Sequence, residues 1–183
     1  MSSVGSDSAS TIAPEDLLQC SVFSGIQLAD AKMILAAVRI MHFEPQTVIL
    51  EEGKSAQALW LILSGECSVL RTSDCGKGQL LATIGQKDVF GEMSFICSRP
   101  HSATIQANTA VTALVYTRED FLILAGSHPT AAFVISSNIA AVLADRLLRM
   151  DNWMCELVNR PEARHHRDEW QAFRSTVYNN WNL

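Results

Sequence analysis

Two short segments in the middle of the chain carry the residues best suited to chemistry. In the first, Phe90–Phe95, Gly91 and the carboxylate of Glu92 precede a short apolar run. We expect a helical turn inserted between two strands, because free N–H groups at its start could hold an anion. The second segment, Ser102–Ala107, adds the hydroxyl of Ser102. An anion cradle beside a carboxylate that accepts from hydroxyls is typical of a site for a sugar phosphate or a nucleotide.

At these residues the chain resembles the cyclic nucleotide-binding domain family, the sensory module of catabolite activator protein and of cAMP-dependent kinase regulatory subunits. The family cassette reads F-G-E-apolar-small-apolar, then a short spacer, then R-S/A-A-T-V-x-A. Its two halves match Phe90–Phe95 and Ser102–Ala107, and two upstream glycine turns match Glu52-Gly53 and Leu63–Glu66. The resemblance covers about Val22 to Met150. It implies a jelly-roll β-barrel that binds cAMP or cGMP.

The resemblance also implies roles for single residues of the cassette. Glu92 would accept a hydrogen bond from the ribose 2′-hydroxyl. Gly91, Ser102 and the backbone N–H of Ala103 would help to hold the cyclic phosphate. Met93 lies beside them in the sequence and completes the expected binding segment.

His101 departs from the family pattern, because it stands where the family carries the arginine that pairs with the phosphate. An arginine supplies a permanent charge and a planar fork, whereas a histidine has an unperturbed pKa near 6.5. Losing a charge-assisted hydrogen bond of about 1.5–3 kcal/mol weakens binding by roughly 10- to 150-fold. Arg99 could reach the same anion across Pro100.

Three interpretations of the site therefore stay open. The chain is a cyclic nucleotide sensor, a module with a degenerate pocket that serves protein–protein interaction, or a sensor of another anionic ligand such as a cyclic dinucleotide. If a cyclic nucleotide binds, we expect His101 to make its affinity depend on pH. Arg146, on a predicted long helix, is a candidate contact for the base, with a solvated helix face as the alternative.

Short β-forming runs separated by turn signals occupy the middle of the chain, which is typical of a sandwich or barrel. The runs are 47–50, 58–63, 67–70, 80–84, 102–107 and 111–116. Helical spacing predicts helices at 14–21, 27–39, 118–124, 129 to about 158, and 162 to about 177. The sequence therefore predicts an α+β fold, a β-barrel flanked by N-terminal helices and a long C-terminal helix.

An apolar stripe along the predicted long helix is close to a coiled-coil seam. It consists of Ile139, Leu143, Leu147, Met150, Met154 and Leu157. Such a stripe packs either on its own barrel or against a second copy, and we expect a homodimer. The helix would signal ligand occupancy to a protein partner that the sequence does not identify.

The composition excludes several classes of function. The 183 residues are 48% hydrophobic and carry a formal net charge of −5, whereas nucleic-acid binders are normally basic. Pro161–Leu183 is too short for a helix-turn-helix, so we expect no DNA binding. No catalytic constellation follows from the residue spacing, and we expect no enzyme activity, cofactor or metal site. Five widely spaced cysteines fit reduced cytoplasmic thiols.

We divide the chain into four regions. They are a disordered tail (1–13), the barrel with its N-terminal helices (14–127), a dimerisation helix (128–160) and a C-terminal helix and tail (161–183). We take the charge-free apolar stretches to be shorter than the roughly 18 residues that span a bilayer. The sequence therefore predicts a cytoplasmic protein without membrane insertion.

Overall fold

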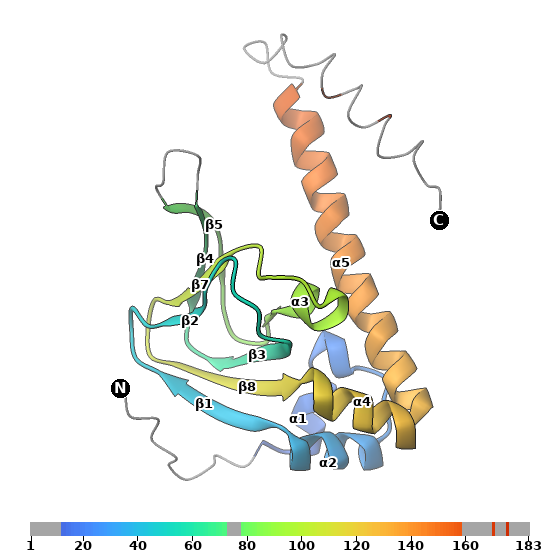
Figure 1. Cartoon of the computed structure of the whole chain (residues 1–183). Coiled ribbons are helices and arrows are strands. Elements are labelled where there is room, and N and C mark those ends of the chain that lie inside the picture. Colours follow the sequence, from blue (N-terminus) through green and yellow to red (C-terminus); the bar gives the residue numbers. More distant parts are fainter. Residues whose placement is uncertain (1–11, 73–77, 159–169, 171–174, 176–183) are drawn as a thin grey trace. The chain divides into compact units, whose positions relative to one another are not determined.

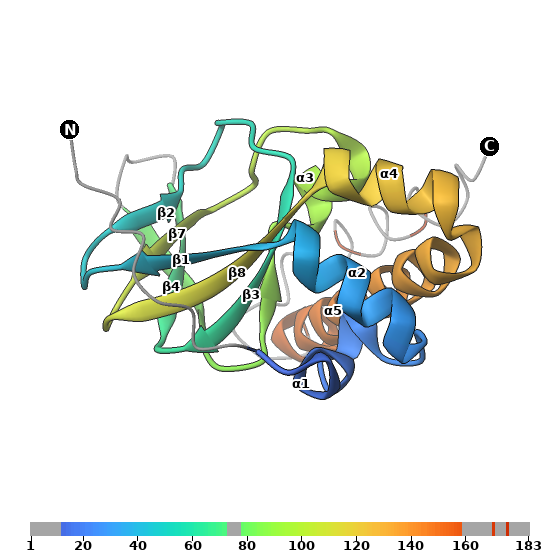
Figure 2. The same ribbon diagram turned by 90° about the horizontal axis from the view of Figure 1, so that it is seen from below.

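The computed structural model describes residues 12–72 and 78–158, together with Trp170 and Ser175. Two antiparallel four-stranded sheets face one another, in the orders β1-β8-β3-β6 and β2-β7-β4-β5 (Figures 1 and 2). The first sheet contains β1 (Arg39–Phe43), β8 (Val111–Thr117), β3 (Ala58–Ser64) and β6 (Val89–Phe90). The second contains β2 (Val48–Leu50), β7 (Thr104–Ala107), β4 (Cys67–Thr72) and β5 (Gly78–Ile84). The α+β jelly-roll predicted from the sequence is confirmed.

The central strand β3 is buried on both faces, which explains its unbroken apolar run. Trp60 and Ile62 point between the two sheets and pack in the core of the barrel. Leu59 lies on the opposite face of β3, opposite Tyr116 of β8 in the pairing register. The Tyr116 ring lies 6.2 Å from Phe23 and 6.5 Å from Phe121, so helical segments cover this outer face. Such double burial replaces the usual polar–apolar alternation.

The helices are shorter at the N-terminus than the sequence predicted. They are α1 (Pro14–Leu18), a 3-10 helix (Ser21–Phe23), α2 (Leu28–Ala37), α3 (Glu92–Cys97), α4 (Arg118–Ser127) and α5 (Pro129–Val158). The prediction that a helix runs to Arg39 was wrong. Val38 is already extended, with ψ 156°, and Arg39 pairs with Val115 as the first residue of β1. Strand pairing with β8 therefore ends α2 two residues earlier.

The chain divides into two compact units, residues 1–139 and 140–183, so that α5 belongs to both. In the first unit, Ile135 and Ile139 of α5 are fully buried. The Asn138 side-chain amide donates to the carbonyls of Val22 and Ser24, at 3.0 and 2.8 Å. These contacts fix the first third of α5 to the N-terminal helical segment.

The second unit carries the remainder of α5. The large apolar side chains Leu147, Leu148, Met150 and Trp153 are all more than half exposed. Residues 1–11 of the predicted tail (1–13) lie outside the described residues, whereas Ala13 is the N-cap of α1. The predicted helix at 162–177 also lies outside the described residues, apart from Trp170 and Ser175.

The expectation that no apolar stretch is long enough to cross a membrane was wrong. Residues Pro129–Glu156 are long and apolar enough to do so, judged by length and composition alone. The first part of this segment nevertheless carries buried Ile135 and Ile139 and donates hydrogen bonds from Asn138 to the barrel unit.

Candidate functional site

Gly91 occupies a position that only glycine fits. It precedes α3 in the left-handed conformation, with φ +81°. A Cβ at this position would lie 2.6 Å from the carbonyl oxygen of Ala58 and 3.0 Å from Cδ1 of Trp60. The missing side chain thus lets the start of α3 pack directly against β3, which sets the position of the next residue, Glu92.

Glu92 opens α3 and is only 3% exposed. A carboxylate in the first turn of a helix is favoured by the free N–H groups there. The hydroxyl of Ser94, two residues further on, donates to the carbonyls of Gly91 and Ala56, at 2.9 and 3.2 Å. These bonds connect the short helix to the end of the β2–β3 loop.

Arg118 holds the other end of α3, a role that sequence reasoning missed. Its guanidinium donates to the carbonyl of Phe95 and, at 3.3 Å, to that of Ile96. A cation at the C-terminal carbonyls of a helix is favourable. The Phe95 ring in turn packs edge-on against Phe121, at 5.3 Å. No local sequence pattern could reveal the bonds of Arg118 to Phe95 and Ile96, because Arg118 lies more than 20 residues beyond both.

The structure brings the two halves of the cassette together. The hydroxyl of Ser102, in the second half, donates to Sδ of Met93 in the first half at 3.7 Å. Both side chains are exposed. Sulfur is a weak acceptor, so this hydroxyl can exchange Met93 for a better partner at little cost. The expected hydroxyl of Ser102 therefore lies beside α3 and is accessible from solvent.

His101 is buried, at 7% exposure, and its backbone is held on both sides by the β2–β3 loop. Its N–H donates to the carbonyl of Lys54 at 2.8 Å, and its own carbonyl accepts from the N–H of Gly53 at 2.9 Å. Ring nitrogen Nε2 has no hydrogen-bond partner among the described residues. Burial lowers the pKa of the imidazole below its ordinary value, because desolvation disfavours the charged form.

The remaining predicted site residues lie in different surroundings. Arg99 is exposed and follows Ser98, which has a positive φ of 52°. Ala103 is half-buried and directly precedes β7. Arg146 belongs to the second unit of the chain. A contact of Arg146 with the base of a ligand therefore stays a prediction.

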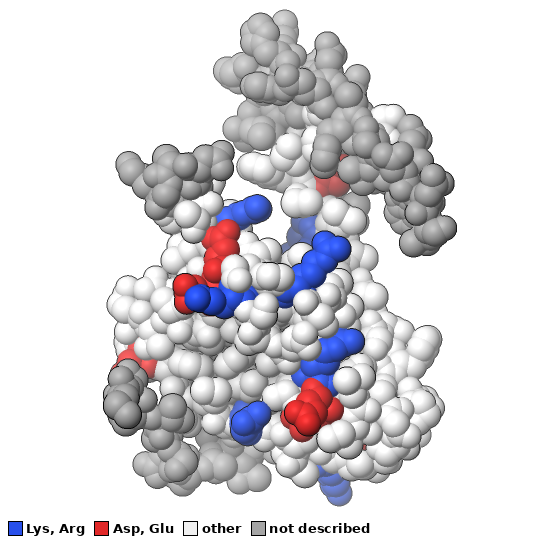
Figure 3. Space-filling view, in the orientation of Figure 1, with Lys and Arg blue, Asp and Glu red and all other residues white. Residues whose placement is uncertain are grey.

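On the face that Figure 3 shows, charge is mixed rather than concentrated. Figure 3 shows basic side chains scattered next to acidic ones on one face, with wide uncharged areas between them. Within residues 12–72 and 78–158, no group of three or more His, Cys, Asp or Glu side chains could hold a metal ion.

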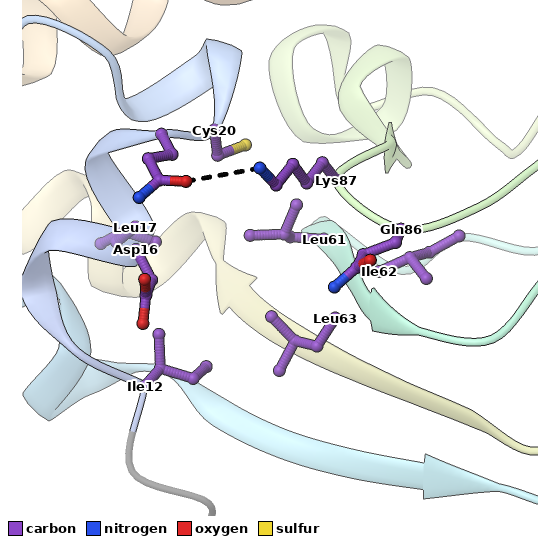
Figure 4. A pocket seen from close by; sticks show the side chains of 10 residues that line it. Ile12, Asp16, Leu17, Cys20, Leu61, Ile62, Leu63, Gln86 and Lys87 are labelled. Atoms are coloured by element: carbon purple, nitrogen blue, oxygen red, sulfur yellow. Dashed lines mark hydrogen bonds between the residues drawn. The ribbon is translucent and has the colours of Figure 1, made fainter.

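A separate pocket of about 320 Å³ lies between α1 and the end of β3 (Figure 4). Leu17, Leu61 and Leu63 contribute apolar walls, and Nζ of Lys87 donates to the side-chain oxygen of Gln19 at 3.3 Å. None of the cassette residues lines this pocket. Sequence reasoning gave no signal for it, since its lining comes from three distant segments.

The barrel matches the family model described as the cyclic nucleotide-binding domain, over residues 40–128. Residues 40–128 belong to the cyclic nucleotide-binding domain family. The resemblance on which the cassette was identified is thereby confirmed, and this family is regulatory rather than catalytic. The matched range includes the whole cassette, from Phe90 to Ala107.

Three similar proteins place this cyclic nucleotide-binding domain among its relatives. The Cyclic AMP receptor protein of Thermus thermophilus is 31% identical over 144 residues, which are 79% of this chain and 64% of that protein. Glutaminase 2 of Bradyrhizobium diazoefficiens is 34% identical over 122 residues, which are 65% of this chain and 19% of that protein. A solved cyclic nucleotide-binding domain from Methylobacillus flagellatus superposes with a TM-score of 0.72 at 21% identity, covering 78% of this chain and 83% of that one.

The chain covers only part of the length of the receptor protein and of the glutaminase. The chain spans less than two thirds of the receptor protein and about one fifth of the glutaminase. The activities of those whole proteins are therefore not assigned to this chain.

Proposed function

We propose that the chain is a regulatory module that binds a cyclic nucleotide, cAMP or cGMP, at the cassette. The observation that carries the proposal is the meeting of the two cassette halves beside the buried carboxylate of Glu92. The family of residues 40–128 supports the ligand class, and the Thermus relative is named for cyclic AMP.

Each cassette residue has a task in this proposal. The carboxylate of Glu92 accepts a hydrogen bond from the ribose 2′-hydroxyl. The hydroxyl of Ser102 leaves the weak acceptor Met93 and donates to the cyclic phosphate, together with the N–H of Ala103. Gly91 lets the start of α3 pack against β3, because a Cβ there would meet the Ala58 carbonyl oxygen, and it thereby sets the position of Glu92 at the site.

We further propose that α5 transmits occupancy and pairs two copies of the chain in the cytoplasm. The exposed apolar side chains of Leu147, Met150 and Trp153 on its second half support a helix-to-helix contact. Ligand binding would then change the presentation of α5 to a protein partner.

The proposal assigns no catalytic step to this chain. Burial raises the pKa of the Cys67 thiol to about 11 and raises that of Cys20 as well, so neither is a ready nucleophile. The alignment with the glutaminase covers 19% of that enzyme. We therefore propose that the shared part is a non-catalytic domain there as well as here.

The test is a thermal-shift screen of the purified chain against cAMP, cGMP and cyclic dinucleotides. A ligand at a hundredfold excess over its Kd adds about 2.7 kcal/mol to the stability of the native state. Each kcal/mol raises the Tm by about 2–4 °C in a chain of this size. We expect a shift with cAMP or cGMP. A Tm shift with cyclic dinucleotides alone would contradict cAMP or cGMP as the ligand and assign the site to cyclic dinucleotides.

A second candidate function is an interaction module that needs no ligand. The burial of a histidine where the family carries an arginine favours it, because the site then lacks a permanent charge for the phosphate. In that case none of the nucleotides would shift the Tm. A protein partner would then bind with equal affinity in their presence and absence.

A further inference from the structure

We propose that His101 couples ligand binding to proton uptake, so that the module responds to a cyclic nucleotide and to acidity together. The inference rests on the proposed function and adds a property to the same site. His101 directly precedes Ser102 and Ala103, which the proposed function assigns to the cyclic phosphate. Its side chain is therefore the nearest titratable group in the sequence to that anion.

The first support is the unsatisfied ring nitrogen. Nε2 of His101 is buried and lacks a partner within the described part of the chain. A buried polar atom without a hydrogen bond normally costs free energy, so an unpaired one in a native protein requires an explanation. A phosphate oxygen held beside the ring would supply the missing partner.

The second support is the rigid placement of the residue. The N–H of His101 donates to Lys54 and its carbonyl accepts from Gly53, so the β2–β3 loop fixes the backbone from both sides. Gly53 is itself in the left-handed conformation, with φ +79°. The backbone is thus held in place, which restricts how far the imidazole can move away toward water when it takes up a charge.

The charged side chains on the segments around His101 do not stabilise a charged imidazole as a bound phosphate would. In the β2–β3 loop, the Glu52 carboxylate accepts a hydrogen bond from the N–H of Thr72 at 2.8 Å. Lys54 contacts His101 through its backbone carbonyl, which accepts from the N–H of His101. Glu51 and Arg99 are exposed, and α3 contributes the buried Glu92. Burial is the cause that lowers the pKa of His101, and none of these charges raises it.

The direction of the linkage follows from these facts. In the free protein the imidazole is neutral down to a pH below its ordinary pKa. A bound phosphate carries a negative charge and favours the imidazolium, so the pKa of His101 is higher in the complex. Binding then takes up a proton, and affinity rises as pH falls from the bound-state pKa to the free-state pKa. Within this window Kd changes by up to about tenfold per pH unit.

The experiment measures the Kd for cAMP and cGMP by calorimetry at pH 6, 7 and 8, in two buffers that differ in ionisation enthalpy. The buffer dependence of the heat counts the protons taken up. His101→Arg and His101→Gln are the test variants. His42→Gln is the matched control, because His42 is exposed on β1 and bonds Thr112 at 3.0 Å. In parallel, NMR follows the ring protons of His101 in the free protein.

We expect proton uptake that approaches one per site in the wild type and in His42→Gln, with a Kd that rises toward pH 8. His101→Arg should bind more tightly at pH 8 with a flat profile, and His101→Gln should bind weakly with a flat profile. Binding without proton uptake between pH 6 and 8 would overturn the inference and leave the proposed function standing. Absence of binding at all three pH values would overturn both.

The NMR titration tests the inference without a ligand. We expect the ring of His101 to titrate below pH 6.5 in the free protein, the ordinary value for histidine. A midpoint at or above 6.5 would contradict the free-state premise of the linkage, which is that burial lowers this pKa.

Discussion

Replacing Gly91 by alanine should destabilise the barrel and displace α3, whether or not a ligand is present. The added Cβ would lie 2.6 Å from the Ala58 carbonyl oxygen, which is a backbone atom of the central strand and cannot rotate away. The left-handed backbone, φ +81°, adds a cost of about 1–2 kcal/mol for a residue with a side chain. Overpacking adds about 1–3 kcal/mol.

The two costs together amount to about 2–5 kcal/mol, a large share of the roughly 5–15 kcal/mol that stabilises a typical domain. The assay is equilibrium unfolding in urea, followed by tryptophan fluorescence. Trp60 is a useful reporter, because its Cδ1 would lie 3.0 Å from the new methyl group.

Gly126→Ala is the control for this variant. Gly126 lies in α4 outside the left-handed region, and a Cβ added there would meet no atom within 4 Å. Alanine there should stabilise the helix by up to about 1 kcal/mol. Equal stability of Gly91→Ala and the wild type would refute the packing argument for Gly91.

Two further predictions concern other parts of the chain. Arg118→Met removes the donors to the Phe95 and Ile96 carbonyls and should cost about 1.5–3 kcal/mol in urea unfolding. The exposed Arg71→Met serves as its control, and equal losses in both would contradict the role of Arg118. Leu143→Glu with Leu147→Glu should convert dimers into monomers in sedimentation, since charge is costly to bury. Ala144→Glu should not, and a monomeric wild type at micromolar concentration would refute the dimer.

The strands could be predicted best where burial decides the residue types. The run Ala58–Leu63 shows a strand, because a segment buried on both faces must be apolar throughout. The strand Arg39–Phe43 was missed, since Arg39 also suits a helix end and only pairing with β8 decides between the two. The two-residue strand Val89–Phe90 is too short to show a period.

The site could be predicted in its residue types but not in its environment. The cassette residues stand together in the sequence, so their chemistry is visible there. The burial of His101 depends on the loop that holds it from Gly53 and Lys54, which are distant in the sequence. The support of α3 by Arg118 likewise depends on the folded chain. Such partners leave no local pattern.

Calorimetric titration of Glu92→Gln with cAMP and cGMP at pH 6 tests the proposed function most directly. The wild type should bind one nucleotide per chain. The amide preserves the shape of the buried side chain but loses the charge-assisted bond to the ribose, worth about 1.5–3 kcal/mol, so affinity should fall by roughly 10- to 150-fold. Glu119→Gln, an exposed change in the first turn of α4, should bind like the wild type. Unchanged affinity in Glu92→Gln, or a wild type that binds neither nucleotide, would contradict the account.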